Sequence, residues 1–105
     1  MDRPKISYVV TVYNKAKYLP HTIESIRSQS LDCTKEFIFV DDASTDNSLE
    51  ILSKETKNMK NVIIIKNDSN KGPSIRLNQG AKRASGEYLH IPLLPVLMIR
   101  LQDLI

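Results

Sequence analysis

A chain of 105 residues with 41% hydrophobic and 26% charged side chains has the composition of one globular domain rather than of a disordered segment. Its formal net charge of +3 is dispersed, which excludes nucleic acid as the expected partner and leaves only a mild attraction to an anionic membrane or a phosphate ligand. Cys33 is the only cysteine, so an intrachain disulfide and a cysteine-based zinc site are both excluded.

Four short apolar runs predict β-strands. Each run is rich in β-branched or aromatic residues and is bounded by polar or turn-forming residues. The runs cover residues 6–12, 36–40, 62–65 and 87–91. We expect the first to be a central strand and the second and third to be buried.

Three amphipathic helices are predicted between these strands. Their apolar faces carry Leu19, Ile23 and Ile26; then Leu49, Ile51 and Leu52; then Ile75, Leu77, Ala81 and Ala84. Pro20 and Pro73 suit first turns of helices, and Gly86 is placed as the terminator of the third. Because strand and helix alternate, the sequence predicts an α/β fold with an open parallel sheet and right-handed crossovers.

Polar side chains follow the first three predicted strands, in loops that such a sheet places at one edge. The set contains Thr11, Tyr13 and Asn14 after the first strand, Asp41, Asp42 and Ser44 after the second, and Asn70, Lys71, Gly72 and Arg76 after the third. Ligands of open α/β sheets bind at this edge. An aromatic ring can stack on a base, a carboxylate can accept a base N–H, and an arginine can bind phosphate, so the set suits a nucleotide. The turn at residues 13–16 has no glycine, which argues against an NAD or FAD site.

Each of these residues also has a purely structural interpretation. Asp41 and Asp42 could do no more than cap the next helix. Tyr13 could merely cover the edge of the sheet, and Arg76 could be a solvated helix residue. The two histidines and the cysteine have no partner acid, base or nucleophile at recognisable spacing, so we assign no catalytic residue.

Residues 5–90 resemble the family 2 glycosyltransferases, which have the GT-A nucleotide-diphospho-sugar transferase fold. Four segments carry the resemblance, in order and with family-like spacing: 10–14, 25–29, 39–46, and 70–72 continuing through 76–78 to 84–88. The resemblance implies a Rossmann-like nucleotide-binding half of an inverting, metal-dependent enzyme. That enzyme transfers a sugar from a nucleotide-diphospho-sugar, expected to be a UDP-sugar, to an acceptor hydroxyl.

The resemblance also implies roles for individual residues. Thr11 and Tyr13 would line the base pocket, with the Tyr13 ring against the base. Asp42 would accept the N3–H of a uridine-type base, which presents a donor between two carbonyls. Asp41 would help to hold the loop.

At the other end of the nucleotide, Arg76 would lie near the ribose or diphosphate. Lys71 and Gly72 would shape the loop there. The alternative that we keep is a non-catalytic nucleotide-binding or interaction module.

The resemblance stops soon after His90. The family would show an Asp-x-Asp type motif there, whose acids hold Mg²⁺ or Mn²⁺, whereas residues 91–105 are mostly apolar with Asp103 as the only acid. We therefore assign no metal ligand and expect this chain not to turn over alone. We divide it into a glycosyltransferase GT-A nucleotide-sugar-binding region, 1–90, and an atypical apolar tail, 91–105. Two hypotheses would account for the tail. One is a frame change, for which a displaced frame across Met98 and Ile99 would encode aspartate, and the other is a truncation.

Location and assembly follow as expectations. The chain shows no signal peptide or membrane span in its sequence, so we expect it in the cytoplasm, with peripheral association at the inner face of the membrane. Polysaccharide biosynthesis is the pathway that the family resemblance implies. An exposed sheet edge beside an apolar tail predicts self-association.

Overall fold

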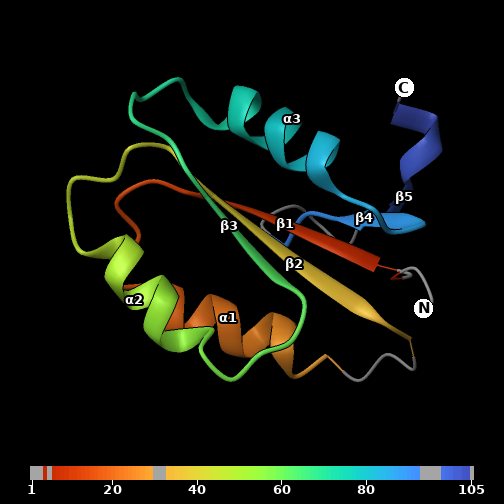
Figure 1. Ribbon diagram of the computed structural model, residues 1–105, viewed down its shortest axis with the longest axis horizontal. Helices are drawn as coiled ribbons and strands as arrows, with labels where there is room; N and C mark the ends of the chain where they lie inside the picture. Colours follow the sequence, from red (N-terminus) through yellow and green to blue (C-terminus); the bar gives the residue numbers. More distant parts are fainter. Residues whose placement is uncertain (1–3, 5, 30–32, 93–97, 105) are drawn as a thin grey trace.

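A five-stranded sheet in the order β3-β2-β1-β4-β5 forms the centre of the computed structural model, which describes residues 4, 6–29, 33–92 and 98–104 (Figure 1). The strands are β1 (Ile6–Val12), β2 (Lys35–Asp41), β3 (Val62–Lys66), β4 (Tyr88–His90) and β5 (Met98–Arg100). The first four run parallel, as predicted, and β5 is antiparallel to β4. The sequence does not predict β5, because a strand of three residues inside an apolar run shows no period.

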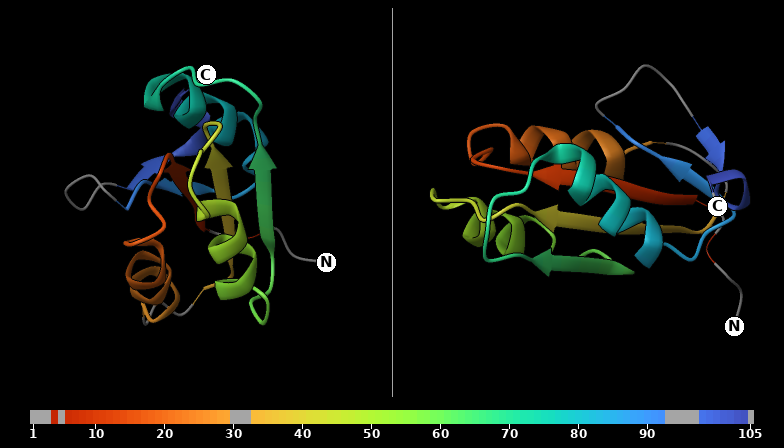
Figure 2. Two further views of the ribbon diagram at one scale, coloured as in Figure 1. Left: turned by 90° about the vertical axis from the view of Figure 1, so that its left-hand side faces the viewer. Right: turned by 90° about the horizontal axis from the view of Figure 1, so that it is seen from above.

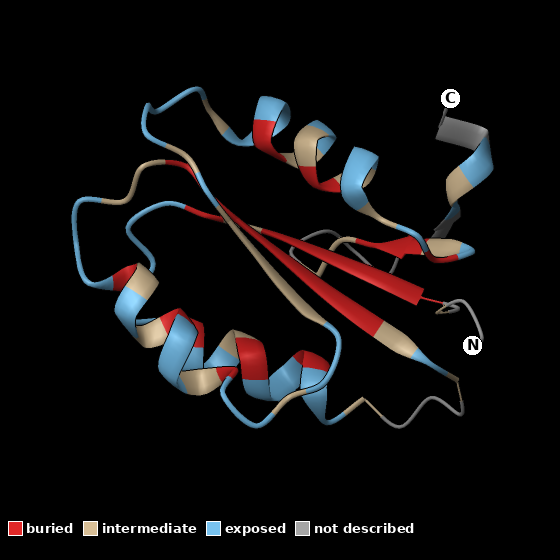
Figure 3. Cartoon of the chain, in the orientation of Figure 1, coloured by how far each residue is buried: buried red, intermediate tan, exposed pale blue. Residues whose placement is uncertain are grey.

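Helices cover both faces of the sheet. α1 (Leu19–Arg27) and α2 (Ser48–Glu55) lie on one face, α3 (Pro73–Arg83) lies on the other, and a short 3₁₀ helix, η1 (Leu101–Leu104), follows β5 (Figures 1 and 2). Alternate residues of the central strands point to opposite faces. Tyr8 therefore packs in the core under α1 and α2, and Val9 packs in the core under α3. Figure 3 shows the resulting pattern, with buried central strands and helices that are buried on one side only.

The predicted apolar face of α1 is confirmed, but that of α3 is partly wrong. Leu19, Ile23 and Ile26 are all buried in the first helix. Ile75 in α3 is 52% exposed, whereas Arg76 and Gly80 are its buried residues. The face of α3 that meets the sheet starts at Arg76 and continues one turn later at Gly80, and Ile75 lies about 100° away from it around the helix.

Gly86 does not terminate α3, which already ends at Arg83. It lies instead where the chain enters β4 against β1. A Cβ atom at Gly86 would lie 2.5 Å from Ser7 Oγ and 2.9 Å from the Ser7 backbone nitrogen. The glycine is needed for this close approach of two strands.

The third strand is half-buried rather than buried as predicted. β3 pairs only with β2 and forms an edge of the sheet, so its residues from Val62 to Ile65 are of intermediate exposure. No helix in the described part of the chain is long and apolar enough to cross a membrane.

The strand order creates a switch point at the carboxyl edge of the sheet. β1 has β2 on one side and β4 on the other. The chain passes from β1 through α1 to β2 and on to β3 on one side, and then crosses back through α3 to β4 on the other side, so the strand order reverses beside β1. The loops after β1, β2 and β3 meet at this edge, on the left in Figure 1. Crevices at such a switch point are the usual binding sites of open α/β sheets.

Candidate functional site

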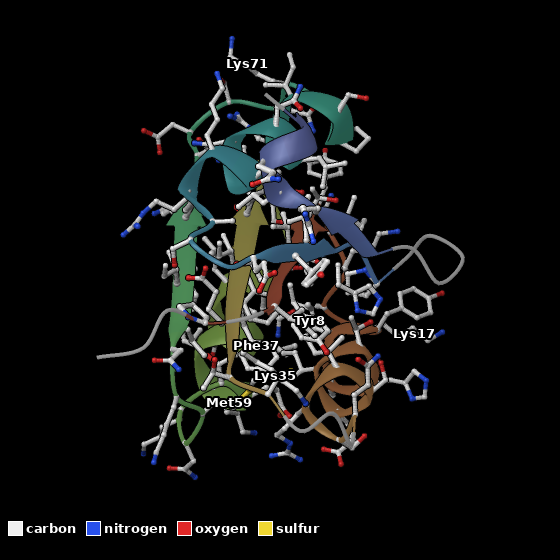
Figure 4. The ribbon with its side chains drawn as sticks, turned by 90° about the vertical axis from the view of Figure 1, so that its right-hand side faces the viewer. Tyr8, Lys17, Lys35, Phe37, Met59 and Lys71 are labelled. Atoms are coloured by element: carbon white, nitrogen blue, oxygen red, sulfur yellow. The ribbon has the colours of Figure 1, made fainter. Side chains whose placement is uncertain are left out.

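The structure brings the predicted polar residues to one edge of the sheet. Thr11 lies near the end of β1 and Tyr13 directly after it, while Asp41 ends β2 and Asp42 follows. The loop between β3 and α3 supplies the remaining residues, Lys71, Gly72 and Arg76. Tyr13 is 42% exposed, and the Lys71 side chain projects from the end of the molecule (Figure 4).

Asp42 is the centre of this cluster. Its Oδ1 accepts hydrogen bonds from the Lys71 amide and from Arg76 Nε, each at 2.8 Å, and its Oδ2 accepts one from the Gly72 amide at 3.0 Å. Asp42 and Arg76 are only 3% and 6% exposed, so they form a buried ion pair. The interpretation of Arg76 as a solvated helix residue is therefore wrong.

The buried pair determines the charge state of Asp42. Burial by itself would raise the pKa of Asp42, but the hydrogen bonds from Lys71, Arg76 and Gly72, together with the positive charge of Arg76, hold that pKa below its usual value. Asp42 is thus a carboxylate at neutral pH. Because its folded-state pKa is depressed, the stability that it contributes is present above the ordinary aspartate pKa and is lost as the pH falls below it.

The pair keeps unused hydrogen-bonding capacity. A carboxylate has about four lone-pair sites, of which the three donors above occupy two on Oδ1 and one on Oδ2. Arg76 has five N–H donors; Nε is used by Asp42, one on Nη1 by Gln79 Oε1, and one on Nη2 by the Ser69 carbonyl. One acceptor site on Asp42 and two donors on Arg76 therefore have no partner among these contacts.

Asp41 has a different environment from its neighbour. Its side chain is fully buried and accepts hydrogen bonds from the Ser44 amide at 3.1 Å and the Ser44 hydroxyl at 2.6 Å. Between them Ala43 adopts a left-handed φ of 61°. Asp41 thus closes the turn after β2, and Asp42 binds amides that precede α3, so neither acid serves the first turn of α2 as a simple cap.

Asn14 links the first two loops. Its Oδ1 accepts hydrogen bonds from the Thr45 amide at 2.7 Å and the Asp46 amide at 3.2 Å. In return, Asn14 N–H donates to Ser44 Oγ at 3.0 Å. Asn14 has a φ of 49°, a conformation that asparagine tolerates better than most residues. The loop that carries Tyr13 is therefore braced against the loop that carries Asp42.

Two amides near Arg76 are missing from the sequence-based set. Asn67 and Gln79 form a reciprocal pair, with Asn67 Nδ2 to Gln79 Oε1 at 2.9 Å and Gln79 Nε2 to Asn67 Oδ1 at 3.1 Å. The only sequence signal for this pair is the spacing of Gln79, three residues after Arg76 on the same side of α3. Asn67, directly after β3, has no such local signal.

A pocket of about 200 Å³ opens beside the cluster, between the end of β1 and the start of α3. Thr11, Pro73 and Leu77 line it together with Ile91 and Pro92, which follow β4. It lies at the switch point between β1 and β4, where the strand order predicts a ligand.

The described residues do not fit a divalent cation. Mg²⁺ and Mn²⁺ need several oxygen ligands, yet Asp41 is taken up by Ser44 and Asp42 by Arg76 and two amides. No cluster of three or more metal-ligating side chains occurs within the described ranges. Of the tail 91–105, in which we assign no metal ligand, residues 93–97 and 105 lie outside those ranges.

His90 is a buried histidine on the opposite face from the pocket. Its ring lies 4.9 Å from that of Tyr8. The Tyr8 ring stacks in turn on that of Phe37 (Figure 4). His90 is 8% exposed, and its Nδ1 has no hydrogen-bond partner among the residues that the structure describes. Burial lowers the pKa of His90 below its ordinary value.

His90 should therefore make the fold sensitive to mild acid. The unfolded chain takes up this proton near pH 6.5, while the folded chain resists it, so stability is complete above that pH and falls as the pH drops toward the folded-state pKa. We expect His90→Phe to remove most of the loss of melting temperature between pH 7 and pH 5. His21→Ala, which changes an exposed histidine, should leave that loss intact. Equal pH profiles for wild type and His90→Phe would contradict this.

Comparison with known proteins shows which family this chain matches. The family model described as "Glycosyl transferase family 2" matches residues 7–91. A poly(ribitol-phosphate) beta-glucosyltransferase of Bacillus spizizenii is 39% identical over 87 residues, which are 81% of this chain and 14% of that protein. This chain thus spans about a seventh of the length of that relative.

Solved structures share the fold. Staphylococcus aureus TarS 1-349 in complex with UDP superposes with a TM-score of 0.76 and 34% identity, over 83% of this chain and 26% of that one. A mannosyltransferase of Pyrobaculum calidifontis in complex with GDP-Man and Mn²⁺ gives a TM-score of 0.74 at 22% identity, over 88% of this chain and 28% of that one. The second likeness shows the fold alone.

Proposed function

Because the chain belongs to glycosyl transferase family 2, we propose that it binds the nucleotide of a UDP-sugar at the carboxyl edge of its sheet. It would act as the donor-binding part of a glycosyltransferase that moves the sugar to an acceptor hydroxyl. The complex of TarS with UDP, a structure 34% identical to this chain, supports a uridine nucleotide.

The observation that carries this proposal is the unused capacity of the buried pair. Asp42 Oδ2 retains one acceptor site and Arg76 retains two donors. The edge of uracil offers a donor, N3–H, between two carbonyl acceptors, which complements an acceptor beside donors. Cytosine has an acceptor at N3, which a carboxylate repels, and guanine would need two acceptor sites for N1–H and N2–H.

The other predicted residues would complete the nucleotide site. Tyr13, on the braced loop after β1, would stack on the base. Thr11 lines the pocket and would meet the nucleotide there. Lys71 and Gly72 would shape the loop. Their amides already orient Asp42, which is a larger part than the sequence alone suggests for them.

We further propose that this chain does not carry out transfer by itself. A divalent ion would stabilise the leaving diphosphate, and the described residues do not fit one. None of the residues that the structure describes at this edge is a candidate for the general base that would activate the acceptor hydroxyl. A non-catalytic nucleotide-binding module therefore remains the second proposal, and the two differ in whether UDP-sugar is consumed, with Mn²⁺ supplied, once this region is joined to an acceptor-binding part.

The sharpest test of the base site uses two exposed tyrosines. We expect UDP to bind the wild-type chain, and Tyr13→Ala to weaken that binding roughly fivefold through loss of stacking. Tyr18→Ala, at a residue 60% exposed on the same connection, is the matched control and should bind as wild type does. Isothermal titration calorimetry with and without Mn²⁺ measures both. No binding of UDP to the wild type would exclude the proposal.

Location and assembly also stay proposals. We place the protein in the cytoplasm, at the inner face of the membrane, where a small positive charge favours anionic lipid. β3 is an edge strand, and edge-to-edge pairing through it would produce self-association.

A further inference from the structure

The Asn67–Gln79 amide pair connects the Asp41 carbonyl to the Asp42–Arg76 ion pair. Asn67 Nδ2 donates to the Asp41 carbonyl at 2.9 Å as well as to Gln79. Gln79 Oε1 also accepts from Arg76 Nη1 at 3.3 Å, and Arg76 Nε binds Asp42. The contacts close a ring that runs from Asp41 through the amide pair and Arg76 back to Asp42.

The two ends of this ring determine how both amides are oriented. Arg76 can only donate, so Gln79 must turn its oxygen toward it. The Asp41 carbonyl can only accept, so Asn67 must turn its nitrogen toward it. In these orientations Asn67 Nδ2 also donates to Gln79 Oε1, and Gln79 Nε2 donates to Asn67 Oδ1. No member of the ring can rotate without breaking at least two hydrogen bonds.

The ring limits the freedom of Arg76. A long arginine side chain has many rotamers, and ordering it costs side-chain entropy. Here Nε, Nη1 and Nη2 each have one acceptor, which come from the loop after β2, from α3 and from the loop before α3 respectively. The plane of the guanidinium group is thereby set before any ligand arrives, which reduces the entropy that binding must still remove.

We propose that Asn67 and Gln79 are positioning residues that hold the Arg76 guanidinium in register with Asp42 and so set the preference of the site for uracil over cytosine. This rests on the proposed function, since it concerns the same nucleotide site. The amides touch no nucleotide. They act by leaving defined N–H groups of Arg76 available beside the free acceptor site of Asp42.

The test uses two variants of Gln79 and two readouts. Gln79→Leu keeps a side chain of similar bulk and removes both hydrogen-bonding groups, whereas Gln79→Glu keeps an acceptor for Arg76. Asn58→Leu, at an exposed amide after α2, is the control. NMR follows the Arg76 Nε–H resonance of the full chain without ligand, and calorimetry gives the ratio of CDP to UDP dissociation constants. Because UDP and CDP carry the same diphosphate, the ratio of their dissociation constants cancels any effect of the variant on diphosphate binding.

We expect Gln79→Leu to broaden the Arg76 Nε–H resonance and to reduce the UDP-over-CDP preference roughly fivefold to tenfold. Gln79→Glu should retain a sharp resonance and most of the preference, and Asn58→Leu should change neither. Thermal melting of each variant shows that it is folded.

A sharp Arg76 resonance and an unchanged ratio in Gln79→Leu would overturn the inference while leaving the proposed function intact. A wild-type chain whose Arg76 resonance is already broad would also overturn it. If the wild type binds neither nucleotide, the proposed function fails and the preference fails with it, although the NMR comparison still decides whether Gln79 holds Arg76.

Discussion

Replacing Asp42 by alanine is expected to lower the melting temperature by roughly 10–20 °C and to abolish UDP binding. The substitution would leave the Arg76 guanidinium buried without its counter-ion, and the Lys71 and Gly72 amides without their acceptor. An uncompensated buried charge costs far more than a lost surface contact. Thermal melting followed by circular dichroism measures the effect. Asp68→Ala, at an exposed acid of the neighbouring loop, should shift the melting temperature by no more than about 2 °C.

A paired substitution separates stability from recognition at this position. Replacing a buried ion pair by two apolar residues is often nearly neutral, so Asp42→Leu combined with Arg76→Met should regain the part of the lost melting temperature that comes from the unpaired guanidinium, while the Lys71 and Gly72 amides still lack their acceptor. It should not regain UDP binding, because the acceptor for the base and its flanking donors are both gone. A double variant that melts as low as Asp42→Ala would contradict the ion-pair explanation, and one that binds UDP normally would contradict the base-reading role.

Gly86→Ala is expected to cost about 3 kcal/mol of unfolding free energy, at the opposite edge of the sheet. The added Cβ would meet Ser7 Oγ at 2.5 Å, the Ser7 nitrogen at 2.9 Å and the Ile6 carbonyl carbon at 3.2 Å. Two of these atoms belong to the backbone of β1, so relief requires that β4 move away from it. β4 leads into Ile91 and Pro92 of the pocket, and we therefore expect weaker UDP binding as well. Urea denaturation measures the stability.

Two further variants test whether contact with the backbone of β1 causes the loss of stability in Gly86→Ala. Adding Ser7→Ala to Gly86→Ala should not restore stability, because the backbone contacts remain. Gly72→Ala should lose roughly 1–3 kcal/mol for another reason, since a Cβ there meets no atom within 4 Å but the φ of 95° is strained for alanine. Recovery of Gly86→Ala to wild-type stability on addition of Ser7→Ala would show that the main-chain contact is not limiting.

Local patterns predicted the elements of this fold well. β-branched runs identified β1 and β2, and the spacing of Leu19, Ile23 and Ile26 identified α1, because these signals depend only on neighbours within a few residues. The half-burial of β3 could not be predicted in this way, since it follows from the strand order. Gly86 was interpreted as a helix terminator because its true constraint, Ser7, lies 79 residues away in sequence.

In the candidate site, as in the fold, local sequence predicts some features, whereas contacts between distant residues determine others. The sheet topology and the loops predicted which edge would carry the polar residues, and that edge is confirmed by the pairing of the strands. The partners within it were not predictable from local sequence, because Arg76 and Asp42 are 34 residues apart and the Asn67–Gln79 pair depends on where α3 crosses the sheet. The roles of Thr11, Tyr13 and Asp42 toward a nucleotide stay predictions.

A titration of the ¹⁵N-labelled chain with UDP, followed by amide chemical shifts, tests the proposed site most directly. The amides of Lys71 and Gly72, which orient Asp42, and that of Ser44, which binds Asp41, should shift progressively and saturate. The amides of Ser85 and Gly86, which bind Glu36 and Ser7 at the opposite edge, should stay in place. Absence of any saturable shift, or shifts confined to the opposite edge, would contradict a nucleotide site at the carboxyl ends of the strands.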